Sequence, residues 1–401
     1  MNIYLSKPGV FCAAGSNGEE LWNTVTSGSQ TGIRKVTTVL SGEDFYAARI
    51  PDPLIPHSSA RYDMRIMGIE EAALNQIEEE ILKVKEKYGA SRIAVCTGSC
   101  DNGTEFSVEG HRVYFKEGKF APDYNIEIQG ADYVSTFIKE KYGLTGPACT
   151  FSTACSSSAG AMIKGAELLE AGLCDAVIAG GIDIASDTTL IGFNSLEAVS
   201  SEITNPFSKN RHGITLGEAG AFFVMTRESL YDDPNRSIKL LGFGETSDAY
   251  HMTSPDPSGE GAERAIRKAL KCAGLEPADI DYVNLHGTGT KFNDSMEAKA
   301  IDRVFGDYKV PVSTTKAETG HTLGAAGSLE AAVCYFTLFE NLSKSSKNAK
   351  LPVQVWDKEQ DPEIPVLNIV DSGFSTEREI RVCMSNSFAF GGANACLIIG
   401  F

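Results

Sequence analysis

Short apolar runs typical of buried strands alternate along the chain with longer segments of helical spacing. The run at 148–154 is followed by a helical pattern in SSSAGAMIKGAELLEAG, at 156–172, and then by a second apolar run, CDAVIAGG, at 174–181. Small residues fill the junction between the first run and the helical segment. This order predicts a strand, a tight turn, a helix and a further strand.

The second part of the chain shows the same alternation. IKLLGFGETSDAY is typical of a strand that runs into a loop, and GAERAIRKALKCAG of an amphipathic helix that ends at Gly274. Four further strands are predicted at 281–285, 310–314, 378–387 and 394–401, and one further helix at 325–340. Strands that alternate with helices favour α/β layers with mostly parallel sheets.

A polar segment, YDDPNR at 231–236, is the clearest boundary in the chain, and it divides the sequence into residues 1–235 and 236–401. The 401 residues suffice for two domains or for one large fold with a buried pocket. The composition is 42% hydrophobic, with 39 Gly against 15 Pro, which indicates a compact, loop-rich α/β enzyme and argues against a disordered or fibrous chain.

The net charge of -17 argues against non-specific binding to nucleic acid or to an anionic membrane. No apolar run is long enough to cross a bilayer, and the start of the sequence lacks a signal-peptide core, so we expect a cytoplasmic protein. The ten cysteines form no CxxC pair, which makes a zinc site or a disulfide framework a poor interpretation. Neither GxGxxG nor a P-loop motif supports nucleotide binding.

One cysteine, Cys155, falls at the predicted turn between a strand and a helix. Its small neighbours allow a tight elbow and the close approach of a substrate. The partial positive charge of a helix N-terminus favours a thiolate, and the backbone N–H groups there can bind an oxyanion. Cys155 is therefore a candidate nucleophile, and a buried structural cysteine is the alternative.

Two of the six histidines lie in glycine-rich segments that follow predicted strands: His286 in NLHGTGT and His321 in KAETGHTLGAAG. A single histidine in such a place is more often structural. Two of them with an elbow cysteine suit carbon–carbon bond formation from a malonyl thioester, because two imidazole N–H groups can bind the enolate oxygen that forms as carbon dioxide leaves. A cysteine hydrolase would need only one histidine.

At these motifs the sequence resembles the β-ketoacyl-[acyl-carrier-protein] synthases of the thiolase-like superfamily, especially the elongating type I and II enzymes. The matching motifs run in the family's order: STACSSSAGA at 152–161, NPFSKNRHGITLGEAGA at 205–221, SDAYHMTSP at 247–255, NLHGTGT and ND at 284–294, STTKAETGHTLGAAGSLEA at 313–331, and SNSFAFGGANA at 385–395. NSLEAVSSE, GEAGA and GANACLIIG also resemble synthases of aryl polyene and related pigment pathways.

The resemblance implies a five-layered α/β/α/β/α fold of two similar halves, with the nucleophile in residues 1–235 and both histidines in residues 236–401. It implies the condensation of an acyl group on Cys155 with malonyl-acyl-carrier-protein, in fatty acid or polyene and polyketide elongation. Neither a redox cofactor nor a catalytic metal is needed. The partners would be an acyl carrier protein and a second copy of the chain, or a related subunit in a heterodimer.

The same resemblance implies roles for further residues. Lys316 matches a lysine beside the second histidine, and Phe390 a gating residue whose N–H completes the oxyanion hole. Substrate-binding positions are matched by Thr288, Thr290, Phe388 and Asp248. A structural monovalent cation, present in some relatives, would bind at Asn284, Glu330, Ser385 and Asn394; a hydrogen-bonded network without an ion is the alternative.

Two departures concern recognition of the carrier. The family's RPF and RDG are replaced by NPF and RHG, with Asn205 and His212. Since the missing arginine contributes to carrier docking in relatives, docking would depend on Arg61 and Arg65, which fit the family's basic docking helix.

Two alternative functions remain for the whole chain. One is a non-condensing partner of the chain-length-factor kind, which usually lacks the cysteine, and the other is a thiolase, which pairs one histidine with a second cysteine.

Overall fold

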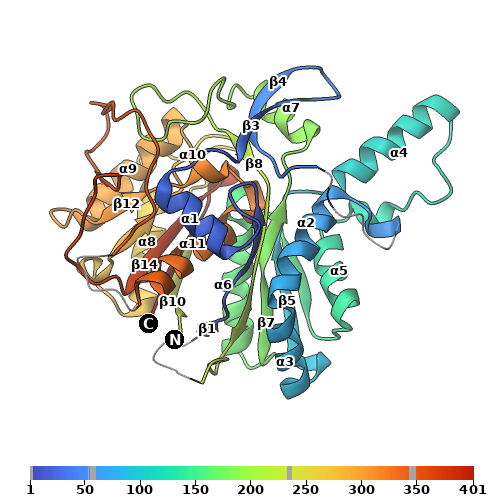
Figure 1. Cartoon of the computed structure of the whole chain (residues 1–401), viewed down its shortest axis with the longest axis horizontal. Helices are drawn as coiled ribbons and strands as arrows, with labels where there is room; N and C mark the ends of the chain where they lie inside the picture. Colours follow the sequence, from blue (N-terminus) through green and yellow to red (C-terminus); the bar gives the residue numbers. More distant parts are fainter. Residues whose placement is uncertain (1–2, 53, 55–59, 233–236, 343–348) are drawn as a thin grey trace.

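A computed structural model of the chain describes residues 3–52, 54, 60–232, 237–342 and 349–401 (Figure 1). The predicted boundary between residues 235 and 236 lies outside these ranges. No helix among the described residues is both long and apolar enough to cross a membrane.

Five strands of the N-terminal half form a mixed sheet: β2 (Gly9–Cys12), β5 (Ile93–Gly98), β6 (Ala148–Phe151), β7 (Ala176–Asp183) and β9 (Ala219–Thr226). Their spatial order is β2-β9-β7-β5-β6. The last strand, β9, is antiparallel to both β2 and β7, whereas β7, β5 and β6 are parallel to one another.

The C-terminal half has the same pattern, with β10 (Lys239–Ser247), β11 (Tyr282–Asn284), β12 (Pro311–Ser313), β14 (Val382–Phe388) and β15 (Ala393–Gly400) in the order β10-β15-β14-β11-β12. Again the last strand is antiparallel to its two neighbours and the other pairs are parallel. The predicted elements are confirmed, but the expectation of mostly parallel sheets is wrong. Strand β15 follows β14 through a short turn, and such a hairpin produces antiparallel pairing.

Short strands complete the sheets. Strand β1 (Ile3–Leu5) pairs with β9 and β10 and so joins the two halves, and β13 (Asn368–Ile369) extends the C-terminal edge. A separate small sheet contains β3 (Ile33–Thr37), β4 (Asp44–Ala48) and β8 (Leu216–Gly217).

Two central helices, α6 (Ser157–Glu170) and α11 (Ala326–Asn341), lie between the sheets of the two halves. The outer face of the N-terminal sheet is covered by α2 (Arg65–Leu74), α3 (Glu78–Tyr88) and α5 (Tyr133–Tyr142). Helices α8 (Glu260–Ala273) and α9 (Lys291–Phe305) cover the C-terminal sheet. The result is the expected five-layered α/β/α/β/α arrangement of two similar halves.

The other helices are α1 (Gly18–Ser27), α4 (Thr104–Glu117), α7 (Asp187–Ser195) and α10 (Lys316–Thr319). Helix α4 extends away from the layered body at the right of Figure 1. All eight residues of β7 and of β9 are buried, because both faces of these central strands are covered; their sequences are therefore continuously apolar rather than alternating.

The central helices touch at their N-terminal ends. A Cβ atom built on Gly327 would lie 2.7 Å from the backbone nitrogen of Ala159, so only glycine fits there. The Ser328 N–H donates to Ser158 Oγ at 2.9 Å, and both groups are buried. This contact holds the first turns of the two helices at a fixed separation.

Replacing Gly327 by valine should lower the free energy of unfolding by about 1–3 kcal/mol, since the added atoms overpack this contact. Chemical denaturation measures the change. The control is Gly192→Ala in α7, where a Cβ meets no atom within 4 Å. This control should be neutral or slightly stabilising, by up to about 1 kcal/mol. Equal stability of the Gly327 variant and the unmodified protein would contradict the proposed close packing.

Candidate active site

Cys155 lies in the short turn that connects β6 to α6, and its side chain is 5% exposed. The preceding residue, Ala154, has a φ of 50°, an unusual conformation for a residue with a Cβ, which turns the backbone sharply before the helix begins. Leu323, at the same place before α11, has a φ of 54°. Each half thus has an elbow at the start of its central helix, as the small residues around Cys155 predicted for the first.

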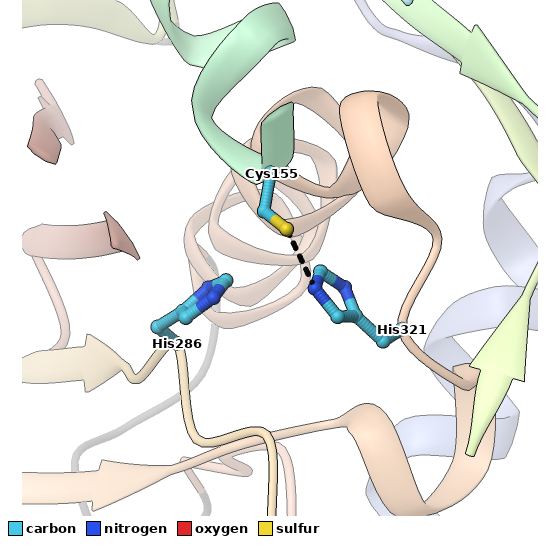
Figure 2. A group of neighbouring side chains, drawn as sticks. All are labelled: Cys155, His286 and His321. Carbon is cyan, nitrogen blue, oxygen red and sulfur yellow. Dashed lines mark hydrogen bonds between the residues drawn. The ribbon is translucent and has the colours of Figure 1, made fainter. Parts of the chain in front are cut away.

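Both predicted histidines lie beside this cysteine (Figure 2). His286 follows β11, and His321 lies between α10 and the elbow that begins α11. The Nε2 atom of His321 is 3.0 Å from Cys155 Sγ, and the two imidazole rings have centroids 5.2 Å apart. The three residues come from three separate loops, so the sheets and central helices together create the cluster.

Burial controls the protonation of this cluster. It raises the pKa of the Cys155 thiol to about 12, although the charge of Lys316 and the N–H of Phe390 act in the opposite direction. The pKa values of both His286 and His321 lie well below the usual range, because of burial and the nearby Lys316 charge. All three side chains are therefore neutral at neutral pH. Desolvation thus outweighs the favourable effect of the helix N-terminus on the thiolate, and the thiol form is favoured in the resting site.

Neither Nδ1 atom of the two histidines has a hydrogen-bond partner within the described part of the chain. A carbonyl or carboxylate oxygen that accepts a hydrogen bond from one ring nitrogen usually fixes a single imidazole tautomer. With none at Nδ1, each neutral ring is able to carry its proton on either nitrogen. The Nε2 atom of His321 can therefore accept the thiol proton in one tautomer and donate a hydrogen bond in the other.

Lys316 is buried, with 1% of its surface exposed. Its Nζ donates to the backbone carbonyl of His286 at 2.5 Å and forms an ion pair with Glu330. Burial raises the pKa of Glu330 to about 7, while Lys316 acts to lower it. The lysine thus holds the His286 loop in place and supplies a positive charge beside both rings, as the resemblance implied.

Two carboxylates of α9 hold the His286 loop, and the sequence analysis assigned neither a role. Glu297 accepts hydrogen bonds from the N–H groups of His286, at 2.8 Å, and Gly287, at 2.7 Å. Asp294 accepts from the N–H of Thr288 at 3.0 Å. Both carboxylates are buried, and burial raises the pKa of Glu297 to about 7. The sequence feature that could have identified them is their separation by three positions, which places both acids on the same face of one helix.

A third buried carboxylate, Asp183 at the end of β7, links the loop after β5 to the elbow that begins α11. It accepts hydrogen bonds from the N–H of Cys100 at 2.9 Å and of Gly324 at 2.6 Å. Burial raises its pKa to about 7. No role for Asp183 was expected, because an aspartate at a strand end carries no sequence signal that separates it from one in a solvated turn.

A cavity of about 500 Å³ leads from the surface to the cluster. Its lining includes seven of the nine residues expected to act in catalysis or substrate binding, without Lys316 and Asp248: Cys155, His286, Thr288, Thr290, His321, Phe388 and Phe390. The hydroxyl of Thr290 also caps α9, and the hydroxyls of Thr288 and Thr290 are 3.0 Å apart. These positions suit contact with a long, narrow substrate arm.

Phe388 is the last residue of β14, and Phe390 lies in the turn that follows it. The Phe390 N–H lies close enough to the Cys155 thiol to act against the rise in its pKa, and the Phe390 ring stacks on Phe193 with centroids 5.8 Å apart. Asp248 does not line the cavity. It accepts a hydrogen bond from Asn394 at 2.7 Å, and its N–H donates to the Gly392 carbonyl at 2.9 Å, so that it anchors this turn.

Three of the four predicted cation ligands keep a free buried oxygen. Asn284 Oδ1, Glu330 Oε2 and Ser385 Oγ have no hydrogen-bond partner among the residues that the structure describes. Asn284 and Ser385 are directly paired across β11 and β14. Unpaired buried oxygens fit a hard monovalent cation, which would neutralise part of the carboxylate charge. The amide of Asn394, in contrast, is bonded to Asp248.

The predicted carrier-docking arginines are occupied within the chain. Arg65 is 8% exposed and forms ion pairs with Glu218 and Asp52. It has no free guanidinium to offer a partner, so a direct docking role for Arg65 is not supported. Arg61 is 39% exposed, and its charge lies 3.7 Å from Glu127 and 3.5 Å from Glu140.

Known proteins resemble this chain over nearly its whole length. Models of the β-ketoacyl synthase N-terminal and C-terminal domains match residues 9–230 and 238–349. The 3-oxoacyl-[acyl-carrier-protein] synthase 2 of Coxiella burnetii is 32% identical, and the match covers 99% of this chain and 98% of that protein.

Two solved structures are also similar to this chain, in both sequence and fold. A chain of the complex of the ketosynthase ApeO with its chain length factor ApeC, from Xenorhabdus doucetiae, is 37% identical with a TM-score of 0.90, over 100% of this chain and 98% of that one. A chain of the ishigamide ketosynthase/chain length factor is 27% identical with a TM-score of 0.87, again over 100% and 98%.

The buried histidines should make the protein sensitive to acid. The unfolded chain binds a proton at each histidine below about pH 6.5, and the folded state does not, because its histidine pKa values are lowered. Stability is therefore lost as the pH falls. For one histidine the loss reaches about 1.4 kcal/mol between pH 8 and pH 5.5.

The substitution His286→Gln removes this contribution and keeps a similar volume. Its free energy of unfolding, relative to that of the unmodified protein, should rise by about 1.4 kcal/mol when the pH is lowered from 8 to 5.5. The buried carboxylates contribute equally to the pH dependence of both proteins, so their effect cancels when the two free energies of unfolding are subtracted. The matched control is the same substitution at exposed His251. A difference that stays constant with pH would contradict a neutral, buried His286.

Proposed function

The chain belongs to the β-ketoacyl synthase family of condensing acyltransferases, and on that premise we propose that Cys155 carries the acyl group which is extended with a malonyl unit. The observation that carries the proposal is the 3.0 Å distance between Cys155 Sγ and His321 Nε2, beside a second neutral histidine at the inner end of a cavity. The substrates are thioesters of an acyl carrier protein, the carrier in the name of the Coxiella burnetii relative.

The first half-reaction transfers an acyl group to Cys155. The thiol proton moves to His321 Nε2, and the sulfur attacks the thioester carbonyl of the acyl carrier. The resulting oxyanion receives hydrogen bonds from the N–H groups of Cys155 and Phe390, which lie at the elbow and beside the thiol. The carrier thiolate leaves and takes the proton back from His321.

The second half-reaction joins the two substrates. The malonyl thioester oxygen accepts hydrogen bonds from Nε2–H of His286 and His321, and carbon dioxide leaves as negative charge develops on that oxygen. The enolate carbon attacks the acyl-cysteine carbonyl and the Cys155 thiolate is expelled. The thiolate then takes up from solvent the one proton that the overall condensation consumes. Burial, together with the charge of Lys316, keeps both imidazoles neutral, so their N–H groups donate without losing a proton.

The chain is proposed to act as the catalytic subunit of a pair. The two similar structures contain a ketosynthase with a chain length factor, which supports a related subunit as the partner of this chain; a homodimer is the alternative. A chain-length-factor role for this chain itself is disfavoured, because the cysteine, both histidines and Lys316 lie together. The products would be 3-oxoacyl chains of fatty acid, polyene or polyketide type, and the aryl polyene group is the pathway that the motifs favour.

Mass spectrometry after incubation with acyl-carrier thioesters should detect an acyl adduct on Cys155, and Cys155→Ala should abolish it. The control is Cys272→Ala, which removes an exposed thiol and should leave the adduct intact. An adduct on another residue, or none with any acyl carrier, would contradict the proposal and favour a non-condensing subunit.

Replacing His286 should affect the two half-reactions to different extents. His286→Ala should slow malonyl decarboxylation by about 10²–10³-fold, because one of two enolate hydrogen bonds is lost. Formation of the acyl-cysteine should change far less, since His321 still accepts the thiol proton. Release of labelled carbon dioxide measures the first step and the adduct measures the second. Equal losses in both steps would contradict this division of roles.

A further inference from the structure

The mouth of the cavity is formed in part by the first two residues of α9, Lys291 and Phe292. Both side chains are exposed, Phe292 by 69%. They line the cavity that leads to Cys155 and also an adjoining surface depression of about 550 Å³. Because the two hollows share these residues, anything that covers the depression also sits beside the entrance.

The depression carries positive charge on a chain whose net charge is -17. Lys291, Lys299 and Lys209 lie on its wall. Lys291 has no ion-pair partner in the described part of the chain, and Lys299 Nζ donates only to the Pro257 carbonyl, at 3.1 Å. Lys209 is paired with Glu359 at 2.6 Å. Two lysines are therefore free to bind an acidic partner.

The acidic residues of this wall do not cancel that charge. Asp361 is held by the buried guanidinium of Arg211 at 2.5 Å. Glu363 is the other carboxylate of the wall, and it is exposed. Lys291 and Lys299 therefore outnumber the one acid that is not already paired with a buried cation.

Exposed apolar side chains accompany the lysines. Leu196, which also lines the cavity, is 52% exposed. Met252, next to the cavity residue Thr253, is exposed too, and its carbonyl accepts a hydrogen bond from Gly391 in the turn that carries Phe390. Of the exposed apolar residues in the described part of the chain, only Phe292 lines both hollows, and an exposed aromatic side chain among charged residues is typical of an interaction site.

We propose that Lys291, Phe292 and Lys299 form the docking surface for an acidic carrier protein, in place of the paired Arg61 and Arg65. The inference rests on the proposed function, because a carrier whose thioester arm reaches Cys155 through this cavity must sit over its mouth. Free lysines supply complementary charge, and Phe292 supplies the apolar contact. Charge at the rim guides encounter, and a central aromatic residue contributes much of the affinity.

The test compares two thioesters of the same acyl group, one on the carrier protein and one on N-acetylcysteamine. The double variant Lys291→Glu and Lys299→Glu should raise the KM for the carrier thioester at least about tenfold more than the KM for the small thioester, since opposite charges become like charges. Phe292→Ser should act in the same direction. Both Lys291 and Phe292 are exposed, and an acidic residue in the first turn of a helix is favourable for folding.

The matched control is Lys271→Glu, which reverses an exposed lysine in the last turn of α8 and should not change the ratio of the two KM values. Arg61→Glu tests the other surface. An unchanged ratio in the Lys291/Lys299 and Phe292 variants, an equal loss with both thioesters, or a rise for Arg61→Glu alone would overturn the proposal. Failure of the proposed function is a separate result, namely no adduct on Cys155 from either thioester.

Discussion

The contact between the first turns of α6 and α11 is the constraint on which the rest of the molecule depends. Glycine at position 327 lets the two helices approach, and the hydrogen bond from Ser328 to Ser158 fixes their relative position. Each helix begins at an elbow of one half, so the contact sets the distance between the sulfur of Cys155 and the imidazole of His321. The two sheets and their outer helices then enclose this contact and remove it from water.

Removal from water determines the electrostatics of the site. A buried thiol, two buried imidazoles, a buried lysine and several buried carboxylates all lie within one region of the interior, where charged forms are disfavoured unless they are paired. A compact ion pair between Lys316 and Glu330 lies beside the neutral histidines. The arrangement holds hydrogen-bond donors ready for charge that appears only during the reaction, which is how enzymes stabilise a developing oxyanion.

Much of this could be predicted from the sequence because the relevant signals are local. Apolar runs marked the buried strands, and Cys155, His286 and His321 all follow strands in glycine-rich or small-residue segments. The pairing of strands depends on contacts between distant segments, so the antiparallel positions of β9 and β15 were missed. Asp294 and Glu297 were missed because acidic residues in a helical pattern usually face solvent. The raised pKa of Cys155 depends on packing from both halves, which no local pattern records.

The two elbows have the same backbone shape and different uses. Cys155 in the first corresponds by position to Gly324 in the second, each following a residue with positive φ and preceding a central helix. In the second elbow the Gly324 N–H is already bound to the carboxylate of Asp183. A duplicated architecture thus uses the same turn in two ways. The second turn is occupied by a buried carboxyl group of the protein itself and holds that part of the fold together, whereas the first places a cysteine at the wall of the cavity.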